Sequence, residues 1–158
     1  MSLTPSGHGR LLVEHAGWTV RREVDVMGQI RSLESVGFPC SQYASEFLRG
    51  FSGLKIEHLP SISIDGREIF TWTEFDPSRV CTERDAWISE KCSEVALESL
   101  FPVGVDGFHL TIYTSPRGRF FAGVDSFVYL YSETIDGLFD KMANGIRPHR
   151  IGVWELDS

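Results

Sequence analysis

Apolar residues repeat at helical spacing in five segments of the chain. The clearest stripe follows the i, i+3, i+4, i+7 spacing of one buried helix face and consists of Ala44, Phe47, Leu48 and Phe51. Capping residues mark the segment ends, because Ser, Thr and Asp accept hydrogen bonds at a helix start and Gly tolerates the backbone conformation that ends a helix. We therefore predict helices over residues 11–17, 25–37, 41–51, 82–97 and 134–145.

Two of these helix ends carry specific patterns. Gly37 followed by Phe38 is typical of a Schellman ending, in which the apolar residue folds back on the last turn. Thr82 with Asp85 three residues later matches a capping box. We expect the helix after Thr82 to bury one apolar stripe, formed by Ile88, Cys92 and Val95.

Alternating apolar and polar residues predict strands over residues 54–59, 61–64, 67–73, 109–114, 119–122 and 127–131. Asp65-Gly66 favours a two-residue type I′ hairpin between the second and third. In that register Ile62 faces Ile69 and lies with Ile64 on one face, while Phe70 and Trp72 lie on the other. We favour coverage of this second face by another element, because most large aromatic side chains are buried; use by a partner is the alternative.

The remaining segments are expected to be turns and chain ends. We expect residues 101–104 to form a turn and residues 115–118 to join two strands tightly. Residues 1–10 are expected to be a flexible N-terminal lead, and Ile151, Val153 and Trp154 allow one more strand in the tail, residues 151–158. The order of elements predicts a single α+β domain over residues 11–150, with a largely antiparallel central sheet bordered by helices.

Charge narrows the classes of partner. The 158 residues include 22 acidic and 15 basic ones, which gives a formal net charge of −7. A surface of this sign repels phosphate backbones and anionic membranes, so direct contact with nucleic acid or membrane is not expected. Much of the charge is local, since residues 68–98 hold eight acidic residues against three basic ones. A basic partner is therefore favoured.

Four glutamates lie along one face of the helix predicted over residues 82–97. Like charges one turn apart destabilise a helix by about 0.2–0.5 kcal/mol per pair, and acidic side chains are unfavourable at its C-terminal end. The stripe is therefore either a solvated face or an anionic docking surface, and the sequence gives both equal weight. As a docking surface it predicts these partner-binding residues: Trp72, Glu74, Asp76, Glu83, Glu90, Glu94 and Glu98.

The sequence offers no catalytic constellation. Its five histidines fall in different predicted elements, and Gly50–Gly53 is one residue short of a nucleophile elbow and follows a helix. Cys40, Cys81 and Cys92 form no C-x-x-C pair, and no signal-peptide pattern is seen, so we expect reduced thiols, no metal and a cytoplasmic location. We expect no enzyme activity and no cofactor. An enzyme of an unrecognised type is the alternative, and it would need a pocket with converging polar groups.

Short motifs in one collinear order extend over about residues 11–148. In order they are Leu11-Leu-x-x-x-Ala16-Gly17-Trp18, Val24-Asp25, Leu33-Glu34-x-x-Gly37-Phe38, Glu46-Phe47-Leu48-x-x-Phe51-x-Gly53-Leu54, Phe75-Asp76-Pro77, Leu100-Phe-Pro-Val-Gly104, Gly118-Arg119, and Leu138 through Gly145-x-Arg147-Pro148. Together they resemble the SUKH-3 family of bacterial immunity proteins. Ser52 departs from the pattern, because the family often has Gly there, and residues 62–73 match poorly.

The resemblance implies an SMI1/KNR4-like α+β domain of a bacterial polymorphic-toxin system. Such a protein binds and blocks the toxin domain of its own cell or its siblings. Many of these toxins are nucleases, and nuclease domains tend to be basic, so the expected partner is a basic cognate toxin domain. The family shares no catalytic residues. A general protein-binding or scaffold module of the same superfamily, without a toxin partner, is the alternative.

Overall fold

The computed structural model describes residues 3–155, which contain five α-helices, one 3-10 helix and nine strands. The helices are α1 (Gly7–His15), α2 (Met27–Ser35), α3 (Gln42–Phe51), the 3-10 helix η1 (Pro77–Arg79), α4 (Glu83–Ala96) and α5 (Ile135–Ala143). The strands are β1 (Lys55–Glu57), β2 (Ser61–Ile62), β3 (Glu68–Ile69), β4 (Trp72–Glu74), β5 (Phe101–Asp106), β6 (Thr111–Thr114), β7 (Phe120–Val124), β8 (Phe127–Ser132) and β9 (His149–Val153).

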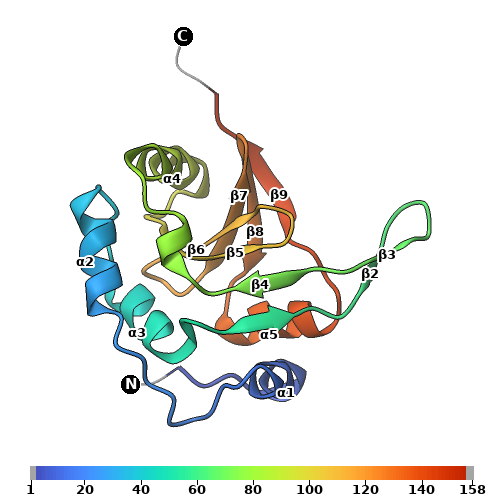
Figure 1. Ribbon diagram of the computed structural model, residues 1–158. Coiled ribbons are helices and arrows are strands. Elements are labelled where there is room, and N and C mark those ends of the chain that lie inside the picture. The colour runs from blue at the N-terminus through green and yellow to red at the C-terminus, as the bar shows by residue number, and fades with distance from the viewer. Residues whose placement is uncertain (1–2, 156–158) are drawn as a thin grey trace.

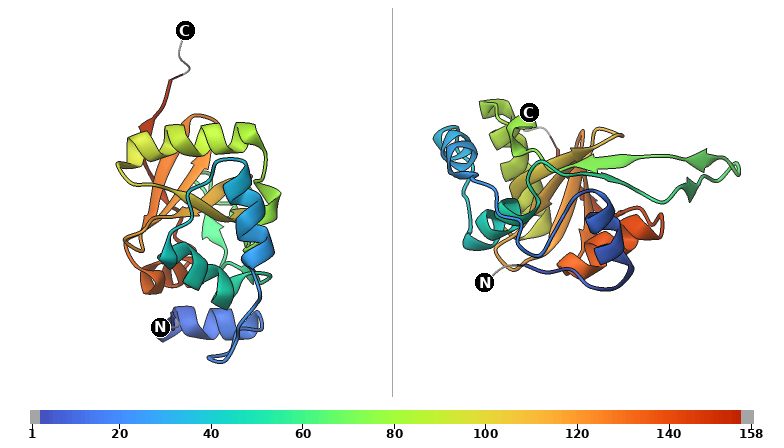
Figure 2. Two further views of the ribbon diagram at one scale, coloured as in Figure 1. Left: turned by 90° about the vertical axis from the view of Figure 1, so that its left-hand side faces the viewer. Right: turned by 60° about the horizontal axis from the view of Figure 1, so that its bottom comes forward.

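Seven strands form one antiparallel sheet in the order β1-β4-β5-β6-β7-β8-β9, while β2 and β3 pair separately (Figure 1). Helices α1 and α5 lie on one side of the molecule and α4 on the other (Figure 2). Side chains that alternate along the strands divide between these sides, since Ile112 joins the larger core and the neighbouring Tyr113 packs under α4. The predicted α+β class with an antiparallel sheet bordered by helices is confirmed.

The larger core is built around aromatic side chains from distant parts of the chain. Phe47 of α3 stacks on Phe51 with 4.8 Å between ring centroids and meets Phe75 edge-on at 5.2 Å. Phe139 of α5 lies 5.1 Å from Phe51, and all four rings are fully buried. Burial of a Phe side chain stabilises a fold by roughly 1.5–3 kcal/mol, so this cluster of four rings anchors α3 and α5 to each other.

The predicted N-caps Ser41, Thr82 and Thr134 are confirmed, whereas the prediction that Asp25 caps the second helix is wrong, because α2 begins at Met27 and its N-cap is Val26, which makes no side-chain cap hydrogen bond. The Ser41 Oγ accepts a hydrogen bond from Ala44 N at 3.1 Å, and the Thr134 Oγ1 accepts one from Gly137 N at 3.0 Å. Helix α2 has the predicted Schellman ending, in which Phe38 N donates to Leu33 O and Gly37 N donates to Glu34 O. Local sequence therefore determines where these helices begin and end.

The prediction of a turn over residues 101–104 is wrong, because these residues begin β5, a strand that is almost wholly buried. Pro102 is tolerated here for two reasons. The register with β6 shifts between Pro102 and Gly104, and β4 pairs only with the far end of β5, at Val105 and Asp106. Gly104 lies so close to β4 that a Cβ there would come within 2.4 Å of Glu74 O.

The hairpin register also differs from the prediction. Ser63 N donates to Arg67 O and Gly66 N donates to Ser63 O, which closes a three-residue loop. Within that loop only Gly66 has a positive φ, +80°, whereas a type I′ turn needs two such residues. Ile62 therefore pairs with Glu68, and Ile62 and Ile69 lie on opposite faces. The favoured coverage of the aromatic residues is wrong for Phe70, which is exposed, while Trp72 is half-buried.

The two ends of the domain are more ordered than the patterns predicted. Helix α1 begins at Gly7 rather than residue 11, and Gly9 N donates to the Asp140 carboxylate of α5 at 3.1 Å. Residues 7–10, expected in a flexible lead, are thus the first turn of this helix. The additional strand in the tail is β9, which starts at His149 and pairs with β8. Residues 1–2 of the predicted lead and 156–158 of the predicted tail lie outside the described residues.

Candidate docking surface on helix α4

Helix α4 is held on the sheet by its inner side, so its outer side is available. The capping box fixes the start of the helix: Thr82 Oγ1 accepts from Asp85 N at 3.1 Å, and Asp85 Oδ2 accepts from Thr82 N at 3.0 Å. Cys92 and Ala96 are buried against Tyr113 and neighbouring side chains, while the expected Ile88 and Val95 are half-buried at the margin. Helical geometry then directs residues on the opposite side to solvent, and these are Glu83, Glu90 and Glu94.

A groove of about 550 Å³ lies between α4 and the segment that follows α2. Val36, Gly37 and Pro39 line it from the α2 side, and Ala86 of α4 contacts Gly37, with 3.7 Å to an ideal Cβ there. The residues that line it from α4 and the following loop include two of the exposed glutamates: Glu83, Ala86, Trp87, Ser89, Glu90, Ser93, Ser99 and Leu100. The groove therefore combines apolar walls with acidic side chains.

Trp87 forms the aromatic part of this groove. Its ring meets Trp154 edge-on at 5.4 Å, which fixes one side of the indole. The guanidinium of Arg84 and the ammonium of Lys91 lie 5.9 and 5.8 Å from the ring centroid. Half-buried and held by these neighbours, Trp87 presents a positioned rather than a mobile apolar surface.

The three glutamates on the outer side of α4 carry uncompensated charge. Among residues 3–155, no basic group lies within 4.0 Å of the carboxylates of Glu83, Glu90 or Glu94. Glu90 and Glu94 are also one helical turn apart, and Glu94 lies in the last turn, near the negative end of the helix dipole. Glu83, in the first turn, is favoured by the helix dipole, whereas the fold tolerates the charges of Glu90 and Glu94 without using them.

Glu98 does not belong to this stripe. Leu97 adopts a left-handed conformation with φ of 59° and ends α4, so the chain leaves the helical path before Glu98. The Glu98 side chain is only 7% exposed, and its Oε2 accepts from Arg119 Nη1 at 2.5 Å. The prediction that Glu98 continues the exposed face is wrong, because the helix ends at Ala96, two residues before Glu98.

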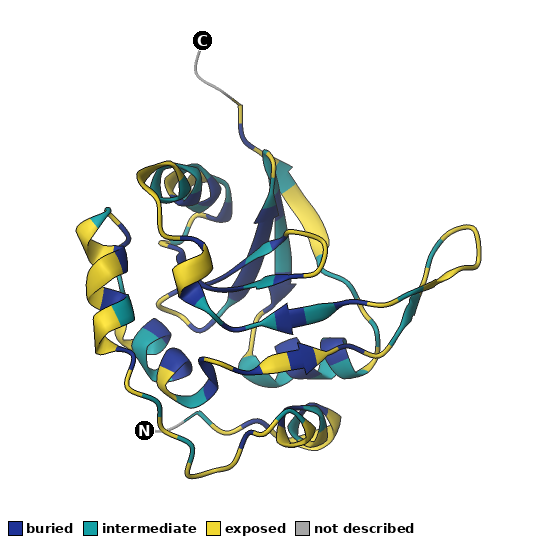
Figure 3. Ribbon diagram, viewed as in Figure 1, coloured by how far each residue is buried: buried dark blue, intermediate teal, exposed yellow. Residues whose placement is uncertain are grey.

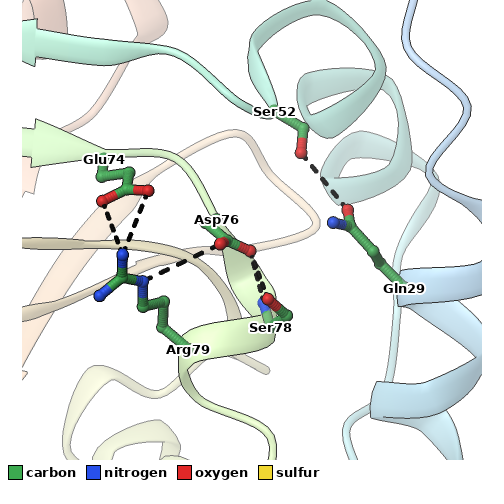
Figure 4. Close-up of polar contacts among 6 residues, drawn as sticks. All are labelled: Gln29, Ser52, Glu74, Asp76, Ser78 and Arg79. Carbon is green, nitrogen blue, oxygen red and sulfur yellow. Dashed lines mark hydrogen bonds and ion pairs between the residues drawn. The ribbon is translucent and has the colours of Figure 1, made fainter.

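Glu74 and Asp76 both form ion pairs with Arg79 (Figure 4). Arg79 of η1 lies 3.2 Å from the Glu74 carboxylate and 3.9 Å from that of Asp76. Asp76 also caps η1, because its Oδ1 accepts from Ser78 N at 3.1 Å and from Ser78 Oγ at 2.6 Å. Both carboxylates therefore have structural partners, and their net field is smaller than that of the α4 glutamates.

Trp72 belongs to another part of the molecule. It lies on β4 next to the root of the hairpin, with the Lys55 ammonium 4.7 Å from its ring centroid. Its carbonyl accepts from Gly107 N at 2.9 Å. The structure thus brings Glu83, Glu90 and Glu94 together and places the other four predicted site residues elsewhere.

A buried polar cluster lies at the hairpin root. The Asp106 carboxylate, which is fully buried, accepts from Arg147 Nη2 at 2.7 Å and from two backbone N–H groups. His58 Nε2 lies 2.7 Å from Thr73 Oγ1, and its backbone N donates to Thr71 O. Burial, helped by the charge of Arg147, lowers the pKa of His58 to about 4, so the ring is neutral near pH 7.

Other reactive groups are inactive by environment. Burial raises the pKa of Cys92 and of Cys40 to about 11, so both thiols are protonated near pH 7. The hydroxyl of Ser52, in the segment that resembles a nucleophile elbow, is within hydrogen-bond distance of Gln29 Oε1 at 3.3 Å (Figure 4). Between residues 3 and 155 no three or more His, Cys, Asp or Glu side chains are placed to hold a metal ion.

The sequence patterns missed the residues that make α4 part of a groove. Trp87 lies on the helix between Glu83 and Glu90, so a helical-wheel plot of the sequence would have placed it on the outer half. Val36 and Pro39 come from a segment about 50 residues away, and no local signal links them to α4. Only the tertiary arrangement identifies the second wall.

A comparison with protein families matches residues 10–145 to the SUKH-3 immunity protein family. The chain belongs to this family. Comparisons with curated proteins and with solved structures gave no match. The family assignment that the collinear motifs predicted is thereby confirmed.

The match to the SUKH-3 immunity protein family includes the whole of α4, both sides of the groove and the β2–β3 hairpin, whereas β9 lies beyond it. The α4 surface, its groove and the hairpin are therefore parts of the family domain itself, whereas Arg147 and Trp154 lie beyond the match. None of the helices that the structure describes combines the length and hydropathy needed to span a membrane.

Proposed function

We propose that this SUKH-3 immunity protein binds a cognate toxin domain and blocks it stoichiometrically, with the outer side of α4 as the docking surface. Family membership supports the immunity role. Glu83, Glu90 and Glu94 support the location, because none of them has an ion-pair partner among the described residues and all three are free to attract a partner, while Glu90 and Glu94 also repel each other one helical turn apart. The proposal includes no catalysis and no cofactor. It places the protein in the cytoplasm, where it would bind a toxin that acts on the cell that produces it.

The proposed partner is a basic protein domain, and a nuclease fits this chemistry. A toxin that binds nucleic acid carries a positive surface. The glutamates of α4 can bind that surface by mimicking the phosphates of the nucleic acid. The groove beside Trp87 adds an apolar contact that can bury the stem of a long basic side chain. Charge gives fast association and rejects acidic proteins, while the groove supplies the desolvated contact that slows dissociation.

The first experiment tests the role. The protein is co-expressed in bacteria with the toxin domain encoded beside its gene, and growth is compared with an empty vector. Restored growth is the expected result. Growth no better than with the empty vector contradicts the immunity role for that pair and favours a binding module without a toxin partner.

The second experiment tests the surface. Charge reversal by Glu90→Lys with Glu94→Lys should lower the association rate constant for the toxin about 10-fold or more at low salt and flatten its salt dependence. The matched control is Glu23→Lys with Glu57→Lys, which makes the same change in net charge on exposed residues outside α4. Equal kinetics for the two double variants, measured by stopped-flow fluorescence, would place the interface elsewhere.

A further inference from the structure

The hairpin of β2 and β3 projects from the body of the molecule and forms a sheet of its own (Figures 1 and 2). A two-stranded hairpin alone is marginally stable in water, and such an arm is normally polar. This arm is not. Ile62 is 66% exposed, Phe70 is 70% exposed and Ile64, in the loop, is fully exposed. The arm therefore presents to solvent the kind of side chains that the core buries.

The exposed apolar side chains gather on one face of the hairpin. Ile62 pairs with Glu68, so their side chains share a face, and alternation along the chain places Phe70 with Glu68, while Ile64 lies in the loop at the tip. Figure 3 shows this arm as mostly exposed. Two further apolar residues, Leu59 and Ile146, are at least half exposed at its root, where Gly145 packs against the carbonyl of Leu59. These five residues, Leu59, Ile62, Ile64, Phe70 and Ile146, are called the hairpin strip below.

The charges beside the hairpin strip have both signs. Asp65 and Arg67 form an ion pair at 3.2 Å, and Glu68 follows on β3. The outer side of α4, in contrast, has an excess of acidic side chains, with Glu83, Glu90 and Glu94 against Arg84 and Lys91 beside Trp87. Two copies of the α4 face repel each other, whereas two copies of an apolar strip flanked by both signs are mutually complementary. A two-fold contact requires this self-complementarity, because the same patch serves both partners.

We propose that the hairpin strip is the interface for a second copy of this chain, and that the two hairpins pack face to face in a two-fold dimer. The α4 surfaces lie away from the hairpins, so both remain free for their own partners (Figure 1). Stable interfaces use roughly 20–30 residues on each side, more than the arm and its root supply. The dimer is therefore concentration-dependent, and because the contact is apolar, it does not weaken as salt rises.

Sedimentation velocity of the full chain tests this proposal over about 1–300 µM, at low and at high salt. Dimerisation is expected as concentration rises. Ile62→Ser with Phe70→Ser should raise the dimer dissociation constant at least about 10-fold. The matched control is Leu11→Ser with Leu97→Ser, which removes two apolar side chains that are 66% and 88% exposed on α1 and at the end of α4. The control should dimerise as the parent chain does.

A monomer at every concentration overturns the proposal. So does a dimer that the hairpin variant leaves intact, or one that dissociates as salt rises. Thermal unfolding checks that both double variants fold. The growth assay with the toxin gives a separate result. If the parent chain is a monomer and the hairpin variant no longer protects cells, then the toxin binds the hairpin strip. This result also overturns the proposal. Protection by the α4 surface does not depend on the dimer, so the two proposals fail independently.

Discussion

The outer side of α4 and the hairpin strip are both exposed surfaces that folding does not require, but they differ in every physical respect. The α4 surface lies on a 14-residue helix packed against the sheet, and it carries an excess of acidic side chains beside a groove. The hairpin strip lies on a projecting arm, with apolar side chains and charges of both signs. The first is suited to a basic partner and the second to an apolar one. One domain thus offers two chemically distinct surfaces at opposite ends.

The two surfaces also differ in how they are supported. Helix α4 is positioned by its buried stripe and by hydrogen bonds to the following loop, where Ser89 Oγ donates to Leu100 O at 3.1 Å. The hairpin depends on its root, where the half-buried Arg147 pairs with the buried Asp106 near the buried His58. An apolar support resists changes of pH, whereas a polar one responds to them. The following predictions exploit this difference.

Removing Arg147 should have the largest effect. Arg147→Met keeps an unbranched apolar side chain but removes the guanidinium, which lies over the Phe108 ring and is the counter-charge of the fully buried Asp106 carboxylate. Because an unpaired buried charge is costly, the free energy of unfolding should fall by about 3–5 kcal/mol. Urea denaturation measures this loss, and adding Asp106→Asn to the variant should recover part of it. A loss below about 1 kcal/mol contradicts the assigned role of the pair in supporting the hairpin root.

Acid should destabilise the protein through His58. Its folded pKa of about 4 lies below the ordinary value of 6.5, so the unfolded chain takes up the proton first. The contribution of His58 to the free energy of unfolding is thus about 2–3 kcal/mol. It is complete above pH 6.5 and is lost as pH falls toward 4. Carboxylates titrate in the same range, so the measurement is the difference between the parent chain and His58→Gln in unfolding free energy from pH 7.5 to 4.5. Parallel curves for the two proteins would show that His58 is not the group responsible.

Two glutamates near the end of α4 should respond oppositely to neutralisation. Glu98→Gln weakens the pair with Arg119, and the unfolding free energy should fall by about 1–2 kcal/mol. Glu90→Gln removes repulsion from Glu94, and stability should rise by about 0.2–0.5 kcal/mol. Chemical denaturation of the two variants in parallel separates the structural carboxylate from the one we assign to docking. A loss of stability in Glu90→Gln as large as in Glu98→Gln would end that distinction.

Phe70→Ser should have the smallest effect on stability, within about 0.5 kcal/mol of the parent chain, because the side chain is already exposed. Phe47→Ala is the contrast, since Phe47 is fully buried and its loss should cost about 3–5 kcal/mol. Thermal unfolding of a dilute sample measures both without contribution from association. A large loss for Phe70→Ser would mean that the arm packs on the body of the domain, and the hairpin strip would not be a free surface.

Much of the fold follows from local patterns. The stripe of Ala44, Phe47, Leu48 and Phe51 is buried as its spacing predicts, and the caps at Ser41, Thr82 and Thr134 are made by the residues that the sequence indicated. These features depend on neighbours within one or two turns of helix. A pattern of this range is visible in the sequence because the interacting groups are only three or four residues apart.

The wrong predictions have two causes, pairing with distant strands and single backbone angles. Pro102 indicated a turn, but its strand has a neighbour on only one side there, which depends on the pairing of β4. Asp65-Gly66 indicated a type I′ turn, and the backbone chose a three-residue loop that shifts the register by one. Glu98 fitted the spacing of the stripe, but the helix ends at Ala96. In each case a distant strand or a single backbone angle decided the outcome.

The sequence by itself determined the family, the α+β class, the helix caps and the excess of acidic residues on α4, because each depends on residue type and short-range spacing. The tertiary structure decided which acidic residues keep a free charge, since Arg79 and Arg119 reach their partners only after folding. It also created the groove against Val36 and Pro39 and exposed Ile62 and Phe70 on the hairpin. Pairing and exposure depend on residues far apart in the chain, so they exist only once the chain is folded.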